Sequence, residues 1–236
     1  MTARDSTGLM AFWADIDESY VEEFRRWHNC EHVGERVGIP GFNVGRRYRG
    51  IGEAPMFFMF YETDDADVLK SAAYLSALNS PTPWTQASLR HFRNPVRTIY
   101  RLAAAAGTAA PSEAPYLFVT RFDVDPVSGP AWLRWYGGEC LSMLCALPGV
   151  FRGRLYEADE AISGLMTSER GLYAGGPGRQ KHCALIELAA PDLPDDPAWR
   201  AAEASATRPP GADAALRDVV AERYWLDFVL YAPNPD

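Results

Sequence analysis

The chain has 236 residues, of which 47% are hydrophobic, and its formal net charge at pH 7 is -8. This is the composition of a globular protein, and the acidic balance argues against nucleic acid as a partner, because phosphate binding needs clustered Lys and Arg. We expect no membrane association and a cytoplasmic location, since no apolar run approaches the roughly 20 residues of a membrane span and the N-terminus lacks the apolar core of a signal peptide.

The hydrophobic pattern predicts the same order of strands and helices twice along the chain. In the first part, strands are predicted at 9–15, 41–49, 56–62 and 95–102, and helices at about 17–38, 65–78 and 84–92. In the second part, strands are predicted at 116–124, 149–156, 182–188 and 223–231, and helices at 130–147 and within 197–220.

These elements suggest a domain division. The first repeat covers 9–102 and is followed by a small, nearly uncharged segment at 103–114, which we interpret as a linker. The second repeat covers 115–231. It contains a Gly-rich segment at 158–180 that has no counterpart in the first repeat, and this segment is predicted to be an inserted flexible loop or lid.

An internal repeat supports this division. The stretch Trp27–Tyr48 aligns without gaps to Trp135–Tyr156 at an offset of 108 positions, with seven identities in 22 positions. One or two identities are expected by chance at roughly 5–7% per position. The identical positions are Trp27/Trp135, Glu31/Glu139, Pro40-Gly41/Pro148-Gly149, Gly45-Arg46/Gly153-Arg154 and Tyr48/Tyr156.

A duplicated β-α-β-β-α-β order predicts two ferredoxin-like units. With Trp27, His32 and Pro40-Gly41 at the end of the first helix, the chain resembles the dimeric α+β barrel superfamily, and within it the EthD-like proteins. The resemblance implies an α+β fold in which two tandem ferredoxin-like units pack sheet to sheet as an intramolecular barrel. It also implies a ligand cleft between helices and sheet. Members include haem-degrading and quinone-forming monooxygenases, isomerases and cyclases, so the fold does not choose a reaction.

The two copies differ in their ionisable residues. His28, His32, Glu35, Arg36 and Arg47 of the first copy correspond to Tyr136, Cys140, Met143, Leu144 and Leu155. We therefore place the working site in the first copy. The candidate catalytic residues are His28, His32 and Glu31, since imidazoles that titrate near neutrality are suited to proton transfer. At 100° per residue, Glu31 falls on the stripe of the helix that faces the core. For Glu31, a structural role is the alternative to a catalytic one. The candidate substrate-binding residues are Trp27, Arg36, Arg47, Tyr61, Tyr74 and Trp84.

The first copy also contains His28-x-x-Glu31-His32, which has the spacing of an inverted zinc-protease motif. No downstream helix offers an obvious third carboxylate, so we expect no metal, and we expect no organic cofactor either.

The leading hypothesis is a small-molecule enzyme of aromatic or polyketide-type metabolism that uses histidine proton transfer. It would be an isomerase, cyclase, dehydratase or lyase acting on an aromatic or dienoic acid. The alternatives are a monooxygenase of the quinone-forming or haem-degrading kind, and a non-catalytic protein that binds an aromatic ligand. Because the expected barrel is complete in one chain, homodimerisation is not required, and it stays open.

Overall fold

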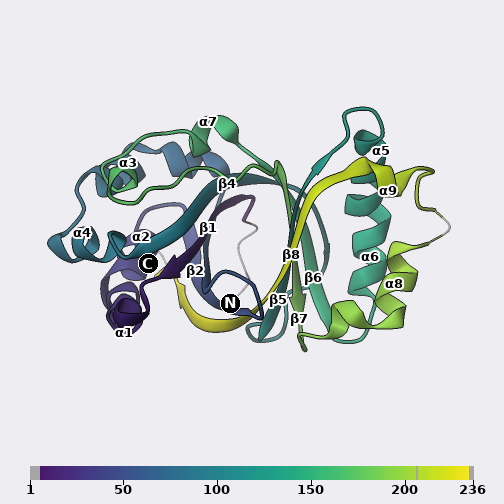
Figure 1. Cartoon of the computed structure of the whole chain (residues 1–236), viewed down its shortest axis with the longest axis horizontal. Helices are drawn as coiled ribbons and strands as arrows, with labels where there is room; N and C mark the ends of the chain where they lie inside the picture. Colours follow the sequence, from purple (N-terminus) through teal and green to yellow (C-terminus); the bar gives the residue numbers. More distant parts are fainter. Residues whose placement is uncertain (1–5, 206, 234–236) are drawn as a thin grey trace.

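The fold is a single closed barrel of antiparallel strands, seen in the computed structural model, which describes residues 6–205 and 207–233 (Figure 1). Its strands are β1 (Gly8–Ile16), β2 (Phe42–Ile51), β3 (Phe57–Thr63), β4 (Phe92–Gly107), β5 (Tyr116–Val124), β6 (Val150–Ala158), β7 (His182–Leu188) and β8 (Leu216–Tyr231). Around the barrel their order is β1-β3-β2-β8-β5-β7-β6-β4.

The predicted packing of two separate sheets face to face is therefore wrong. The cause lies in β4 and β8, which have 16 residues each. The first part of β4 pairs with β1 and its last part with β6, while β8 pairs first with β5 and then with β2. Each long strand thus joins the two halves and leaves no edge with unpaired backbone groups. For the same reason, residues 103–107 of the predicted linker belong to β4, and residues 216–220 of the predicted helical region belong to β8.

Side chains alternate between the inside of the barrel and the helices that cover its outside, as the period of two in a strand requires. On β1, Leu9, Ala11 and Trp13 point inward, and Met10 and Phe12 point to the helices. On β3, the inward residues are Phe58 and Phe60, and the outward ones are Phe57, Met59 and Tyr61. The outer face of β3 therefore forms the floor beneath the first-half helices.

The helices lie in two groups on opposite sides of the barrel (Figure 1). The first group consists of η1 (Glu18–Tyr20), α1 (Val21–Trp27), η2 (His28–His32), α2 (Val33–Val37), η3 (Ala66–Lys70), α3 (Ala72–Asn79) and α4 (Pro83–Leu89). The second consists of α5 (Gly129–Trp135), η4 (Tyr136–Cys140), α6 (Leu141–Cys145), η6 (Leu193–Asp195), α8 (Pro197–Glu203) and α9 (Ala212–Ala215). Within the described residues, every helix is too short or too polar to cross a membrane.

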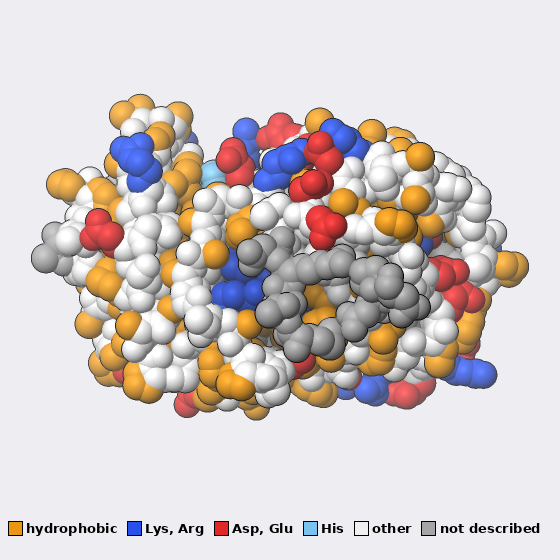
Figure 2. Space-filling model, turned by 180° about the vertical axis from the view of Figure 1, so that it is seen from behind, with side chains coloured by type: hydrophobic (Ala, Val, Ile, Leu, Met, Phe, Trp, Pro, Cys, Tyr) orange, Lys and Arg blue, Asp and Glu red, His pale blue; other side chains and the backbone are white. Residues whose placement is uncertain are grey.

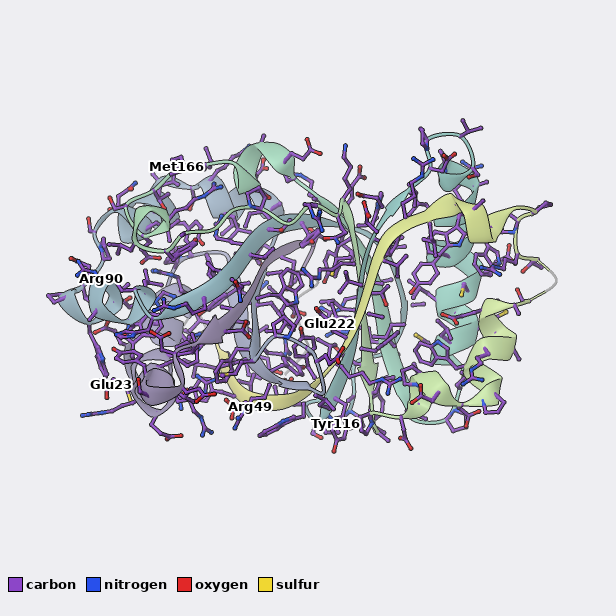
Figure 3. The ribbon with its side chains drawn as sticks, in the orientation of Figure 1. Glu23, Arg49, Arg90, Tyr116, Met166 and Glu222 are labelled. Atoms are coloured by element: carbon purple, nitrogen blue, oxygen red, sulfur yellow. The ribbon has the colours of Figure 1, made fainter. Side chains whose placement is uncertain are left out.

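The Gly-rich insertion does not stay with the second group. Its short helices α7 (Glu160–Ser163) and η5 (Arg170–Leu172) lie over the first half, where Figure 3 labels the exposed Met166 above α3. The backbone N–H of Glu169 donates to the carbonyl oxygen of Leu78 at 3.0 Å, and that of Arg97 donates to the carbonyl oxygen of Gly176 at 3.0 Å. The second half therefore supplies a cover for the first.

The two ends of the described chain meet at Asn43, at the start of β2. The Asn43 side-chain amide donates to Ser6 Oγ at 2.9 Å, and the backbone N–H of Ala232 donates to the Asn43 carbonyl oxygen at 2.9 Å. On the face seen in Figure 2, acidic and basic side chains stand next to one another along the upper edge, in keeping with the mixed charge of the sequence.

Candidate active site

The helix that carries both candidate histidines contains a π-helical turn, η2 (His28–His32), between α1 and α2. Its buried residues fall in adjacent pairs, 27/28, 32/33 and 36/37. The first step between pairs is five residues and the second is four, because the π turn inserts one extra residue. As a result His28 and His32 both face inward, with exposed fractions of 2% and 9%, and Glu31 is turned partly outward. The placement of Glu31 on the core stripe by the 100° rule is wrong.

The same π turn recurs in the second half as η4 (Tyr136–Cys140), where Tyr136 and Cys140 are buried and Glu139 is exposed. The helical geometry is thus shared by the two copies, and only the first copy places imidazoles on it. The π turn alone therefore does not mark a site, and the imidazoles distinguish the first copy from the second.

The residues around this turn line a pocket between the first-half helices, the outer face of the barrel and the insertion. Its apolar walls are formed by Met10, Phe12, Trp27, Met59, Leu78, Leu89, Phe92 and Tyr173. Its polar lining is formed by His28, His32, Arg36, Tyr61, Tyr74, Arg97, Thr167, Glu169 and Arg170. The enclosed part has a cavity volume of about 40 Å³, room for roughly three water molecules. The pocket opens to solvent at its mouth.

His28 is held by a buried arginine. Arg47 Nη1 lies 3.0 Å from His28 Nδ1, and Arg47 Nε donates to Asp227 Oδ2 on β8 at 2.7 Å. A guanidinium only donates hydrogen bonds, so Nδ1 of His28 must accept, and the neutral ring carries its proton on Nε2. Burial, followed by the charges of Arg47 and Arg36, lowers the pKa of His28 well below its usual value. His28 is therefore a neutral N–H donor at physiological pH.

His32 is placed differently. Its ring packs against Trp27, with ring centroids 4.4 Å apart, and its Nδ1 is buried without a hydrogen-bond partner. Burial, followed by the charges of Arg36 and His28, lowers the pKa of His32 well below its usual value. His32 is thus also neutral near pH 7, with a ring nitrogen left free for a ligand inside the pocket.

Two further polar groups complete the pocket near the histidines. The Tyr61 hydroxyl is buried and has no hydrogen-bond partner, and burial raises its pKa above the usual value, so it remains a neutral donor. Arg36 is 1% exposed and forms an ion pair with Glu169 of the insertion. A buried unpaired polar atom costs on the order of 1–3 kcal/mol, so the unbonded Tyr61 Oη and His32 Nδ1 indicate a polar ligand in this space.

Three predicted site residues lie elsewhere. Glu31 Oε1 accepts hydrogen bonds from Thr82 Oγ1 at 2.6 Å and Thr85 Oγ1 at 3.1 Å, and so ties η2 to the N-terminus of α4. Trp84 Nε1 donates to Glu23, a residue labelled on α1 in Figure 3. Arg47 lies behind His28, between the rings of Phe24, Phe57 and Phe228. The other predicted residues, Trp27, His28, His32, Arg36, Tyr61 and Tyr74, line one pocket.

Sequence reasoning missed residues that reach the site from distant parts of the chain. Glu169, Arg170 and Tyr173 come from the insertion, and no local pattern marks them. Asp227 is different, because a carboxylate within the apolar run R-Y-W-L-D-F-V-L-Y is a visible signal of a buried charge with a partner. Among the described residues, no group of three or more His, Cys, Asp or Glu could hold a metal ion.

No family model and no curated protein matches the chain. Its structure is similar to that of an anthrone oxidase-like protein, with a TM-score of 0.66 and 12% identity over 99% of this chain and 97% of the other. It is also similar to a candidate monooxygenase from Fusobacterium nucleatum (TM-score 0.64, 8% identity, 98% and 96% covered). A third similar structure is that of a candidate chlorite dismutase (0.53, 13%, 94% and 95%). At these identities the likeness is one of fold alone, and the dimeric α+β barrel superfamily and its EthD-like subgroup stay predictions.

Proposed function

We propose that the protein is a small-molecule oxygenase that converts an activated CH₂ group of a flat aromatic ketone into a carbonyl, with dioxygen as the oxidant. The observation that carries the proposal is the pair of buried neutral histidines in an aromatic pocket, of which His28 is bonded to Arg47 through Nδ1 while the Nδ1 of His32 has no partner. The names of the similar structures, anthrone oxidase-like and monooxygenase, favour this reaction over the isomerase or lyase reaction expected first, for which the same histidines would also serve.

The first step is proton removal. His32 takes a proton from the CH₂ carbon that is conjugated with the ketone through the aromatic rings, using the ring nitrogen that has no partner in the protein. The negative charge moves to the ketone oxygen, where the Nε2–H of His28 and the Tyr61 hydroxyl are the donors that stabilise it. A neutral His28 suits this donor role, because a positive charge on it would lower the basicity of the neighbouring His32.

The second step is oxygenation. The carbanion gives its electrons to dioxygen, a C–O bond forms, and the protonated His32 returns its proton to give a hydroperoxide. His32 then removes the second proton from the same carbon, the O–O bond breaks, and the carbonyl forms with release of hydroxide, which takes that proton and leaves as water. The sum is R₂CH₂ + O₂ → R₂C=O + H₂O. All four electrons that dioxygen accepts come from the substrate, so the proposed reaction needs no further reductant.

His28 does not suit the role of an iron ligand for the haem of haem-degrading superfamily members. Arg47 donates to Nδ1 of His28, so the neutral ring carries its proton on Nε2 and has no lone pair free to bind iron. The proposed reaction therefore contains no step that depends on a haem.

The test is oxygen uptake with anthrone and with a carboxylated anthrone as substrates, without added reductant. We expect one O₂ consumed per anthraquinone formed, and one ¹⁸O atom from ¹⁸O₂ in the product carbonyl. His32→Ala should lower kcat/KM by about 10²–10⁴-fold as loss of a general base, and His28→Ala by about 10²–10³-fold as loss of an oxyanion donor.

The matched control is His91→Ala. His91 lies between α4 and β4 and does not line the pocket, and its Nδ1 is 2.9 Å from Asp17 Oδ2. This variant should keep wild-type turnover. If both site variants also keep it, or if the wild-type protein binds these ketones and returns them unchanged in oxygenated buffer, the proposal fails and the binding-protein alternative gains.

A further inference from the structure

We propose that Arg97 and Tyr74 form a subsite for a carboxylate on the substrate, separate from the histidines that would carry out the reaction. The substrate of the proposed oxygenation would then be an aromatic ketone that bears a carboxylate. The reaction assigned to this substrate rests on the proposed function, but the subsite itself is a statement about binding.

The charge balance of the pocket supports an anionic ligand. The charged side chains in its lining are three arginines, Arg36, Arg97 and Arg170, and one carboxylate, Glu169, while both histidines are held neutral by burial. The lining therefore has an excess of positive charge although the whole chain is acidic. An anion that enters the pocket would offset this excess.

The three arginines differ in their partners. Arg36 is paired with Glu169, and Arg170 Nη1 donates to the carbonyl oxygens of Ser163 and Leu165, both at 2.9 Å. Arg97 Nη2 donates to the neutral hydroxyl of Tyr74 at 3.2 Å, and within the described chain no carboxylate comes within ion-pairing distance of it. Neither Arg97 nor Arg170 forms an ion pair within the described chain, and Glu169 acts on Arg97 only over a longer distance. Arg170 is held by two carbonyl oxygens, whereas the side-chain partner of Arg97 is the Tyr74 hydroxyl.

The geometry around Arg97 suits a carboxylate. Its guanidinium has five N–H donors in a planar arrangement that matches two carboxylate oxygens, and one of them is used on Tyr74. The Tyr74 hydroxyl accepts that bond and keeps its own proton to donate to the same anion. The Tyr74 side chain is 1% exposed and packs on Phe42, and the backbone of Arg97 is bonded to Gly176 of the insertion.

These two residues come from elements that do not carry the histidines. Tyr74 lies on α3 and Arg97 on β4, whereas His28 and His32 lie on η2. Arg36 lies between the two groups, since its charge acts on both histidines and its own surroundings include Tyr61, Tyr74 and Glu169. A substrate bound by its carboxylate at Arg97 would therefore extend past Arg36 toward the histidines.

The test is equilibrium binding by calorimetry with naphthalene-2-carboxylate and its uncharged isostere naphthalene-2-carboxamide. We expect wild-type protein to bind the carboxylate at least about tenfold more tightly than the amide. Arg97→Met should remove this preference while leaving amide affinity within about twofold, Arg97→Lys should retain part of it, and Tyr74→Phe should reduce it. Arg101→Met is the matched control, because Arg101 is on the same strand but pairs with Asp67 and Asp159 at the surface, and it should keep the full preference.

Equal wild-type affinity for the two ligands would overturn the proposal, and so would an Arg97→Met protein that is folded by circular dichroism and keeps the preference. If Arg97→Met does not fold, the loss of preference in Tyr74→Phe and its partial retention in Arg97→Lys decide the question. No turnover is needed in these measurements. The subsite can therefore stand if oxygen uptake is never seen, and it can fail while oxygenation of uncharged ketones is found.

Discussion

At the scale of single residues, His28 and His32 differ in their hydrogen-bond partners, although their ring centroids are only 5.7 Å apart. Arg47 occupies the acceptor nitrogen of His28, whereas His32 keeps a nitrogen without a partner. The sequence shows two histidines of the same type, and only the structure assigns the proton. Asp227 has a positioning role in this arrangement, since it holds Arg47 from the last strand.

The lowered pKa values of both histidines predict a dependence of stability on pH. Below about pH 6.5 the unfolded chain binds protons that the folded chain does not, so stability is lost as the pH falls. The slope is at most roughly 1.4 kcal/mol per pH unit for each histidine. Burial raises the pKa of Glu169. At pH values above the usual pKa of a glutamate, this shift increases stability as the pH falls, so it makes the net loss of stability smaller.

Urea unfolding at pH 7.5 and pH 5.5 measures this effect. The doubly substituted protein His28→Gln, His32→Gln should lose clearly less stability between the two pH values than the wild-type protein. An equal loss in both proteins would show that the histidines are not neutral in the folded state.

At the scale of elements, the π turn explains why the directions of the site residues could not be predicted from the sequence. The residue types and the comparison of the two copies were enough to find His28, His32 and Arg36, because chemistry-bearing residues are kept in one copy only. Their directions could not be predicted, since the 100° rule assumes an unbroken α-helix and so misplaced Glu31 by the one residue that the π turn adds. Arg97 and Glu169 were missed because their role depends on contacts between segments far apart in the chain.

A second prediction follows from the close approach of α2 to β2. A Cβ atom at Gly45 would lie 2.7 Å from the Tyr61 ring and 2.9 Å from Val33 Cγ1, so Gly45→Ala must displace Tyr61 or the helix. Its repeat mate, Gly153, would meet Leu141 Cδ2 at 2.9 Å in the second half. Both variants should lose about 1–3 kcal/mol of unfolding free energy through overpacking.

Only Gly45→Ala should also lower the affinity for naphthalene-2-carboxylate, because only Gly45 lies beside a pocket residue. Denaturant titration and calorimetry on both variants check this. Equal effects on binding would argue against a working site confined to the first half.

At the scale of the whole molecule, the order of strands and helices could be predicted from the sequence, and the closure of the barrel could not. The run Leu102–Gly107 continues β4 with alternate residues facing the second-half helices, and Ala104 and Ala106 pack there. With alanine on both faces, this run shows no hydrophobic alternation and was interpreted as a linker. The strand is recognised only by its partner, β6.

Closure also joins the halves through charges inside the barrel, where Glu62 on β3 pairs with Arg46 on β2 at 3.1 Å and with Arg154 on β6. Glu62→Gln would remove the carboxylate shared by two buried guanidinium groups, and would leave Arg46 paired with Glu113 and Arg154 paired with Glu187. We expect a loss of about 1–3 kcal/mol in the free energy of unfolding, in one cooperative transition that includes both halves. The exposed Glu22→Gln, with a side chain 87% exposed, is the control and should change stability by less than about 0.5 kcal/mol. Urea unfolding followed by fluorescence and circular dichroism would reveal separate transitions if the halves were independent.

Ser6 and Ala232 both bond to Asn43, so the two ends of the described chain lie close together. A circular permutant opened between β4 and β5 would keep every strand pair of the barrel and would reverse the order of the copies. The position of the candidate site in the N-terminal copy is therefore not imposed by the order of synthesis or by the barrel. It follows from which copy retained its imidazoles and which one supplied the cover.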